Sequence, residues 1–273
     1  MKPAKKKPSA APNLPPMPSM DPSMTFEGLR GSLSDEFGWR IFRIMSEFVE
    51  GFQLIRTLNN TVSFFGSARF DENQHHYKEA RELGRMLGKA GYTIVTGGGP
   101  GIMEAGNRGA LEVGAPSIGL NIQLPKEQHL NPYVTQSIGF HYFFTRKVML
   151  SYAAQAYVFF PGGFGTLNEL MELLTLIQTQ KIERIPIILI GKDFWLPFME
   201  WIEVHVYKRH KAIDKKDMGV YHLVDNLREA FNIILRTKTC PPNAPNCWIG
   251  FQKKHLGRNA KRFTAKPGRK SKR

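Results

Sequence analysis

Short apolar runs alternate with helix-like stretches along most of this chain, and this alternation constrains the fold more than any other feature. Each run is apolar on both faces and is followed by a segment with apolar residues three and four positions apart. Strands of this kind, separated by helices, form a parallel sheet that is covered on both sides. The pattern predicts an α/β protein with a doubly wound, Rossmann-like parallel sheet. The predicted strands lie at 61–65, 92–95, 117–122, 156–160 and 185–190, and the predicted helices at 34–58, 73–90, 101–113, 141–154, 164–179, 194–207 and 225–236.

The positive charge of the chain is concentrated at its two ends. The 273 residues carry a net charge of +15, with four lysines and no acid in residues 1–20 and ten Lys or Arg and no acid in residues 253–273. Subtracting these cations leaves +1 for residues 21–252. The net positive charge therefore comes from the two ends of the chain and gives little information about residues 21–252.

The change in composition along the chain sets the bounds of the expected domain. Residues 1–24 are rich in Pro, Lys and Ser and have no apolar periodicity, so we expect a disordered basic arm there. Residues 253–273 have a similar composition and predict a disordered basic tail. Residues 25–252 are expected to form a single Rossmann-like domain that begins with an N-terminal helix.

Other features exclude several classes of protein. No stretch approaches ~18 uninterrupted apolar residues, and no apolar segment follows the first lysines, so we expect neither a membrane span nor a secretory signal but a cytoplasmic protein. Cys240 and Cys247 are too few for a four-ligand metal site or a disulfide framework and predict ordinary reduced thiols. The pair His75-His76 fits a solvated helix face. We therefore expect no metal and no cofactor.

Two glycine motifs directly follow predicted strands, where parallel sheets place their ligand sites. The first is Thr96-Gly97-Gly98-Gly99-Pro100-Gly101, which opens a predicted helix. Consecutive glycines let backbone N–H groups approach an anion, and a helix N-terminus attracts negative charge. The motif is neither a dinucleotide fingerprint nor a Walker loop. A tight strand-to-helix turn without a ligand is the alternative interpretation.

The second motif, Pro161-Gly162-Gly163-Phe164-Gly165-Thr166-Leu167-Asn168-Glu169, indicates a ligand more sharply. Its glycines and the Thr166 hydroxyl at a helix start predict a phosphate cradle. Glu169 lies one helical turn beyond Gly165. Because a carboxylate repels a phosphate, Glu169 either has a chemical role or caps its own helix.

A pair of cations, Arg146-Lys147, lies on the predicted helix before that motif. Adjacent helical residues point about 100° apart, so both cannot face one ligand squarely. One of them can bind the ligand while the other pairs elsewhere. Arg146 is the better candidate for a two-pronged contact with phosphate or carboxylate.

These residues together resemble the LOG family, named after the plant "lonely guy" protein. The resemblance rests on GGGPGIMEA, PGGFGTLNE, the Arg146-Lys147 pair and the upstream Phe65-Gly66-Ser67-Ala68-Arg69, and it covers about residues 61–236. Family members are cytokinin riboside 5′-monophosphate phosphoribohydrolases, bacterial members also act as AMP nucleosidases, and many were once labelled lysine decarboxylases. The resemblance implies that nucleoside 5′-monophosphates are hydrolysed to free base and ribose 5-phosphate.

The resemblance also implies a role for each matching residue. It makes Glu169 and Arg146 the catalytic residues. This chain departs from the plant pattern at Asn168, where a second acid is usual, and in a first glycine loop that is shorter by one residue. Both departures concern the preferred base more than the reaction type. The substrate-binding residues that it implies are Gly98, Gly99, Glu127, Lys147, Gly162, Gly163, Gly165, Thr166 and Thr175.

The residues by themselves suit the same reaction. Positive charge builds on the ribose as the base departs, and a nearby carboxylate stabilises that state or orients the attacking water. We assign this role to Glu169, with Arg146 ordering the phosphate or Glu169 itself. Phosphate binding by the second motif fixes the sugar, so that remote binding energy assists the reaction.

The sequence also allows two alternative functions and predicts one partner. A non-catalytic carrier, like the molybdenum-cofactor carrier proteins of similar fold, would bind a nucleotide without releasing base. A nucleic-acid-associated protein would make salt-dependent, sequence-independent contacts through the basic tails, which otherwise serve only to solubilise the chain. A homodimer is expected because the helix 34–58 and the apolar stretch 194–207 supply more apolar surface than one sheet face needs, and because the LOG family is commonly dimeric.

Overall fold

The computed structural model describes residues 35–123 and 130–236. The chain divides into two compact units, Met1–Met45 and Ser46–Arg273, and the boundary falls inside the first described helix. Residues 35–45 form the first half of that helix, and all the other described elements belong to the second unit. Among the described helices, none is long and apolar enough to cross a membrane.

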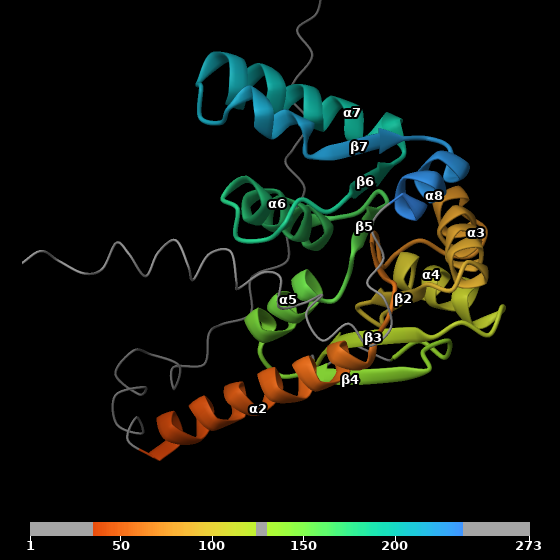
Figure 1. Ribbon diagram of the computed structural model, residues 1–273, viewed down its shortest axis with the longest axis vertical. Helices are drawn as coiled ribbons and strands as arrows, with labels where there is room; N and C mark the ends of the chain where they lie inside the picture. Colours follow the sequence, from red (N-terminus) through yellow and green to blue (C-terminus); the bar gives the residue numbers. More distant parts are fainter. Residues whose placement is uncertain (1–34, 124–129, 237–273) are drawn as a thin grey trace, which may run out of the picture. The chain divides into compact units, whose positions relative to one another are not determined.

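The second unit is built on seven parallel strands, and the predicted doubly wound α/β class is confirmed (Figure 1). The strand order is β4-β3-β2-β1-β5-β6-β7. Val62 in β1 lies in register with Ile94 in β2 on one side and with Ala156 in β5 on the other. The strands are β1 (Thr61–Phe65), β2 (Thr93–Thr96), β3 (Ser117–Ile122), β4 (Gln136–Phe140), β5 (Ala156–Phe159), β6 (Ile187–Ile190) and β7 (Tyr221–Val224).

Helices cover both faces of this sheet, and each face has its own apolar core (Figure 1). One core joins the sheet to α3, α4 and α8, and the other joins it to α5, α6, α7 and the second half of α2. The helices are α2 (Asp35–Thr57), α3 (His75–Lys89), α4 (Ile102–Leu111), α5 (Phe143–Tyr152), α6 (Phe164–Gln178), α7 (Lys192–Trp201), the π-helix η2 (Ile202–Arg209), the 3-10 helix η3 (Lys215–Gly219) and α8 (Leu227–Leu235).

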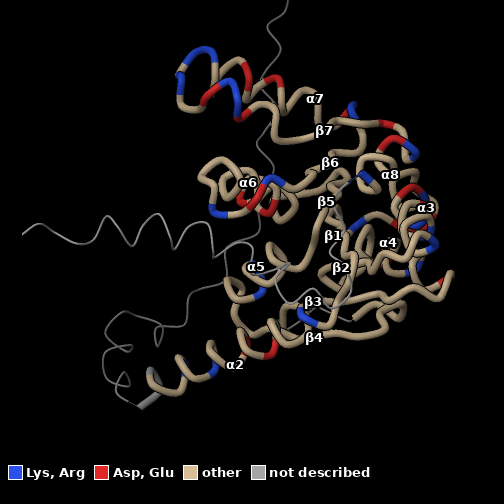
Figure 2. The backbone as a smooth tube through the Cα atoms, viewed as in Figure 1, with Lys and Arg blue, Asp and Glu red and all other residues tan. Residues whose placement is uncertain are grey.

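Charge is excluded from the sheet and spread over the helices. The seven strands contain no Asp, Glu, Lys or Arg, and the charged residues of both signs lie on the described helices and loops (Figure 2). Strands buried on both faces cannot hold an unpaired charge at acceptable cost. This distribution agrees with the near-neutral balance of residues 21–252.

The sequence pattern does not predict β4 and β7, and it predicts one helix where α7 and η2 follow each other. The two missed strands form the two edges of the sheet. In β4 only Phe140 is fully buried, and in β7 only Val224. An edge strand of this kind lacks the continuous apolar run by which the inner strands were recognised.

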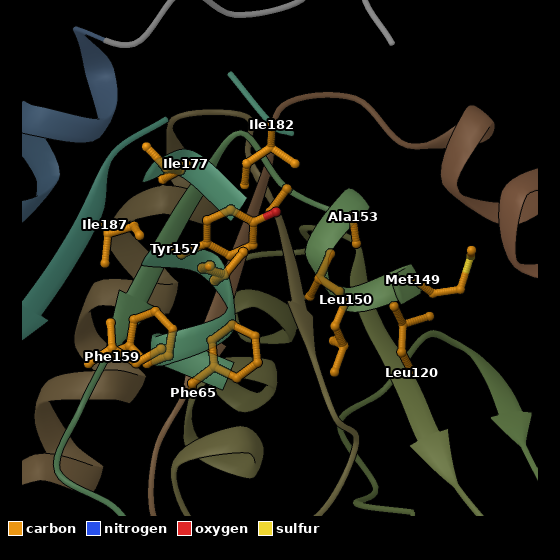
Figure 3. Packing of buried hydrophobic residues seen from close by; sticks show 14 of the residues in the cluster. Phe65, Leu120, Met149, Leu150, Ala153, Tyr157, Phe159, Ile177, Ile182 and Ile187 are labelled. Carbon is orange, nitrogen blue, oxygen red and sulfur yellow. The ribbon is translucent and has the colours of Figure 1, made fainter. Parts of the chain in front are cut away.

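The core comes closest to the candidate site at the ends of β1 and β5. The rings of Phe65 and Phe159 stack with centroids 4.8 Å apart and an angle of 11° between their planes. Both rings lie beside Tyr157 in the close view of Figure 3. This packing holds the carboxyl ends of the two central strands at a fixed separation.

Candidate active site

A cavity of about 810 Å³ opens at the carboxyl ends of β1 and β5. From β1 the chain builds outward to β4, and from β5 it builds outward in the opposite direction to β7, so strand order reverses between these two strands. Ligands of doubly wound sheets bind at such a reversal, because the loops after the two strands diverge there. Residues 66–69 after β1 and residues 162–169 after β5 line this cavity.

The second glycine motif forms the N-terminal end of α6 at this cavity. Gly163 is the N-cap of α6 and has no side chain to satisfy the first backbone N–H groups. A Cβ atom added to Gly163 or Gly165 would meet no other atom within 4 Å, and neither residue has a positive φ. The fold itself therefore does not require glycine at these two positions. The open space and the free N–H groups of a helix N-terminus suit an anion.

Gly162 and Thr166 have a different role in this loop. A Cβ atom on Gly162 would collide with the Thr166 hydroxyl and lie 3.0 Å from the carbonyl carbon of Gly66. Gly162 is thus needed for close packing between the loops after β1 and β5. Thr166 is 6% exposed and also lines the cavity.

Glu169 lies on the second turn of α6, lines the cavity and is 6% exposed. Burial raises the pKa of its carboxyl to about 7, Arg146 opposes this shift, and Glu172 adds to it. Its Oε2 has no hydrogen-bond partner among the described residues, and neither an ion pair nor a bond to the first-turn N–H groups of α6 is formed there. The geometry thus disfavours helix capping and leaves an unsatisfied carboxylate at the cavity.

Arg146, on the first turn of α5, brings a positive charge to the same cavity. Its Nε donates a hydrogen bond to the carbonyl of Leu120 at 2.8 Å, and its guanidinium carbon lies 5.8 Å from the centre of the Phe143 ring. Burial lowers the pKa of Arg146, and the charge of Glu169 partly offsets that effect. An arginine nevertheless stays charged at any physiological pH.

Lys147 and Thr175 do not reach the cavity lining in this structure. Lys147 Nζ pairs with Glu172 Oε2 at 2.5 Å. Thr175 is exposed, and its hydroxyl donates to the carbonyl of Met171 within its own helix at 2.7 Å. Their roles in substrate binding therefore remain predictions, without support from geometry. Glu127 lies outside the described residues.

The first glycine motif is shaped by a buried polar network. Gly98 has φ +71°. The backbone N–H of Asn131 donates to the carbonyl of Gly98 at 2.9 Å, and its side-chain amide donates to that of Gly99 at 3.0 Å. Asn107 joins this network through Asn131 at 3.0 Å. Gly98 and Gly99 are both buried, and neither lines the cavity. Their assignment as substrate contacts stays a prediction that this geometry does not favour.

Gly97 is the member of that motif that lies at the cavity. A Cβ atom on Gly97 would collide with the guanidinium of Arg146 and lie 2.8 Å from the sulfur of Met103. Gly97 therefore makes room for the catalytic candidate on α5. A local sequence pattern cannot indicate this role, because Gly97 and Arg146 are far apart in the chain.

Several cavity residues were not among the predicted site residues, and four of them have side chains suited to a ligand. They are Arg69 after β1 and three phenylalanines, Phe143, Phe164 and Phe194. Arg69 forms no ion pair within the described part of the chain, and Phe164 is 92% exposed although it is large and apolar. The place of Arg69 directly after an inner strand was a signal available in the sequence. The three rings could be recognised only once the fold brought their helices together.

Comparisons with known proteins agree with the residue-level resemblance. The family model described as "Possible lysine decarboxylase" matches residues 103–234. The cytokinin riboside 5′-monophosphate phosphoribohydrolase LOG of Oryza sativa subsp. japonica is 31% identical over 159 residues, which cover 56% of this chain and 64% of that protein. The pyrimidine/purine nucleotide 5′-monophosphate nucleosidase of Escherichia coli (strain K12) is 32% identical over 148 residues, or 48% of this chain and 31% of that protein.

Among solved structures, the molybdenum cofactor carrier protein of Chlamydomonas reinhardtii has a similar fold. It is 21% identical, with a TM-score of 0.50, over 65% of this chain and 96% of that chain. At this identity the similarity concerns the fold alone. This chain spans less than two thirds of the length of the curated relatives named above. The resemblance to the LOG family that the two glycine motifs predict is confirmed by the family model and by these relatives.

Proposed function

We propose that this protein hydrolyses the N-glycosidic bond of nucleoside 5′-monophosphates such as AMP, giving free base and ribose 5-phosphate. One observation carries the proposal: the buried Glu169 carboxylate has an oxygen without a hydrogen-bond partner in the described part of the chain, and it lies in the same cavity as a glycine-lined helix N-terminus. The loop suits the phosphate, and the carboxylate suits the positive charge that forms on the ribose. The names of the rice and bacterial relatives support this reaction class.

The cavity lining contains groups that suit each part of such a nucleotide. The N–H groups at the start of α6 attract the phosphate, and so does Arg69, which has no ion pair with any of the described residues. Glu169 lies one helical turn further and is within the same cavity. The rings of Phe143, Phe164 and Phe194 offer apolar surface for a base, because every nucleobase has a face that stacks on an aromatic ring.

Glu169 acts in its ionised form in this mechanism. A carboxylate stabilises the oxocarbenium-like transition state or orients the attacking water, and a protonated carboxyl does neither. Arg146 favours the ionised form, since its charge lowers the pKa of Glu169 against the effect of burial. The pKa of about 7 places the change between the two forms near neutral pH.

The test measures base released from AMP, CMP and isopentenyladenosine monophosphate, with adenosine as a substrate that lacks the phosphate. We expect cleavage of the monophosphates, poor cleavage of adenosine, and a kcat/KM that rises as the pH increases through about 7. Glu169→Gln should lose about 100-fold or more in turnover. Glu183→Gln, an exposed acid further along the chain, is the matched control and should keep wild-type activity.

Two outcomes would contradict this proposal. Full turnover in Glu169→Gln would remove this residue from the mechanism. Tight binding of AMP without base release from any of the monophosphates would favour the carrier alternative, in which the cavity holds a phosphorylated ligand and the carboxylate has no chemical task.

A further inference from the structure

A buried carboxylate on α2 holds the first turn of α5, the helix that carries Arg146. Glu47 is 7% exposed. It accepts hydrogen bonds from the backbone N–H of His141 at 2.8 Å, from the backbone N–H of Tyr142 at 3.4 Å and from the hydroxyl of Thr145 at 2.5 Å. Tyr142 is the N-cap of α5, and no side chain of its own caps the helix. Glu47, 94 residues before His141, instead binds the backbone at the entrance to α5 and the Thr145 hydroxyl of its first turn.

The rest of α2 follows α5 in the same direction. Gly51 lets the two helices approach closely, since a Cβ atom there would lie 2.5 Å from the sulfur of Met149. One residue later, the rings of Phe52 and Tyr152 meet edge to face, with centroids 6.0 Å apart. Both contacts lie toward the C-terminal end of α5. Glu47 is therefore the residue of α2 that fixes the N-terminal end of α5.

The negative charge of Glu47 suits this position. The first turn of α5 contains no acidic residue, and a helix N-terminus is stabilised by an anion. Within residues 35–123 and 130–236, Glu47 forms no ion pair with Lys or Arg. Its interactions are thus directed to the backbone and the hydroxyl of this single turn, and Thr145 is the residue immediately before Arg146.

Arg146 depends on the placement of that turn. Its Nε is bound to the carbonyl of Leu120 on β3, so the backbone of α5 and one fixed carbonyl together set where the guanidinium lies. A small shift of the first turn would displace the guanidinium from the cavity side or break the bond to Leu120. Misplacement of a reacting group by about 1 Å can cost on the order of 100-fold in rate.

We propose that Glu47 is a positioning residue for the reaction, which fixes the first turn of α5 and thereby holds the Arg146 guanidinium at the cavity beside Glu169. Its effect on activity rests on the proposed function. Its effect on α5 is a property of the folded chain and can be measured without a substrate.

The first experiment compares Glu47→Gln with Glu50→Gln, an exposed acid on the same helix. The glutamine keeps the size of the side chain and loses its charge. We expect kcat/KM for AMP to fall about 10-fold or more in Glu47→Gln and to stay at the wild-type value in the control. A merely stabilising role would lower the melting temperature and leave the kcat/KM of the folded protein unchanged, which would overturn the proposal.

The pH profile separates positioning from stabilisation. Four groups act electrostatically on Glu169 or are affected by it, namely Arg146 and Lys147 from α5, Glu172 from α6 and Tyr157 from β5. Only the two cations belong to α5, and both favour the ionised carboxylate. Loosening α5 should therefore move the rise of kcat/KM to higher pH in Glu47→Gln. A rise at the wild-type pH would contradict the positioning of Arg146 by Glu47.

Hydrogen exchange tests the same proposal independently of catalysis. Backbone amides at the start of α5 should exchange faster in Glu47→Gln than in the wild type, while those of α3, on the opposite face of the sheet, should not change. Unchanged exchange in α5 would overturn the proposal even in an active enzyme. If the wild type releases no base while exchange in α5 increases as expected, the proposed function fails and the anchoring of α5 stands.

A milder variant tests the same proposal if the Glu47→Gln protein does not fold. Thr145→Val removes one of the three hydrogen bonds to Glu47 and keeps the shape of the side chain. It should change exchange and activity in the same direction by a smaller factor. In the double variant the two effects should not add, because both substitutions act on one interaction. Full additivity would mean that Glu47 acts by another route.

Discussion

At the scale of single residues, Glu169 has a carboxyl group that suits the proposed reaction, but it lies in a buried environment that disfavours its ionised form. Its carboxyl is buried in a largely apolar cavity wall, and burial raises its pKa to about 7. A group with a pKa near neutrality is well suited to a reaction at neutral pH. The same shift means that the ionised form destabilises the folded chain.

This conflict predicts a pH-dependent stability that Glu169→Gln removes. The unfolded chain loses the Glu169 proton near its ordinary pKa of 4.5, whereas the folded chain keeps it until about pH 7. Stability therefore falls as the pH rises between these values and stays lower above them. The folded state loses on the order of 3 kcal/mol from this one group at pH 8.

Denaturant unfolding of the two proteins at pH 5 and pH 8 checks this prediction. The free energy of unfolding of Glu169→Gln minus that of the wild type should be larger at pH 8 than at pH 5, so that the variant gains relative stability as the pH rises, although it is the less active enzyme. Glu183→Gln should show no such change between the two pH values. An equal difference at both pH values would mean that Glu169 ionises normally in the folded chain.

At the scale of secondary-structure elements, the start of α6 separates glycines that the fold needs from glycines that a ligand needs. Gly162 faces the Thr166 hydroxyl and the loop after β1, while Gly163 and Gly165 face open space. A glycine without a steric reason in the protein indicates close approach by something else, such as a phosphate.

Alanine at Gly163 or Gly165 should therefore lower the affinity for AMP without lowering the stability of the protein. Gly165→Ala should stabilise α6 by about 0.5–1 kcal/mol, because alanine favours a helix over glycine. It should also weaken AMP binding about 10-fold or more, equivalent to about 1.4 kcal/mol, because the methyl group occupies the phosphate position. Gly163→Ala should weaken binding with little effect on stability.

Gly162→Ala is the contrasting variant, since its methyl group collides with Thr166 and should lower the melting temperature. Thermal unfolding and calorimetric titration with AMP measure the two effects separately. Undiminished AMP binding in both Gly163→Ala and Gly165→Ala would place the phosphate elsewhere in the cavity.

At the scale of the whole molecule, the strongest electrostatic feature is the pair of basic ends. Fourteen cations lie in residues 1–20 and 253–273, against a net charge of +1 for the remainder. The charge follows from the sequence alone, since both segments lie outside the described residues. Cations of this density bind nucleic acid with little sequence preference and with strong dependence on salt.

Deleting residues 1–20 and 253–273 should separate this interaction from the enzymatic site. The full chain should bind single-stranded RNA at low salt and lose affinity steeply as salt increases. The shortened chain should lose that binding and keep its cleavage of AMP, because the cavity lies within residues 64–194. Fluorescence anisotropy with labelled RNA at two salt concentrations checks the first part. Equal RNA binding by both chains would assign it to residues 21–252.

The sequence by itself determined the fold class and the main candidate for the chemistry. Inner strands of a parallel sheet are apolar on both faces, so their runs were recognisable, and the glycine motifs after two of them indicated where a ligand binds. Glu169 could be singled out because one helical turn links it to Gly165. These signals are local, since each depends on residues close together in the chain.

Only the tertiary structure determined the positions and the contacts of the remaining residues. It placed Arg146 at the cavity and paired Lys147 with Glu172, and it enclosed Gly98 and Gly99 in a polar network. It added β4 and β7, whose exposed edges left no apolar run. It also brought Glu47 to α5. Each of these results depends on contacts between segments distant in sequence, which no local pattern encodes.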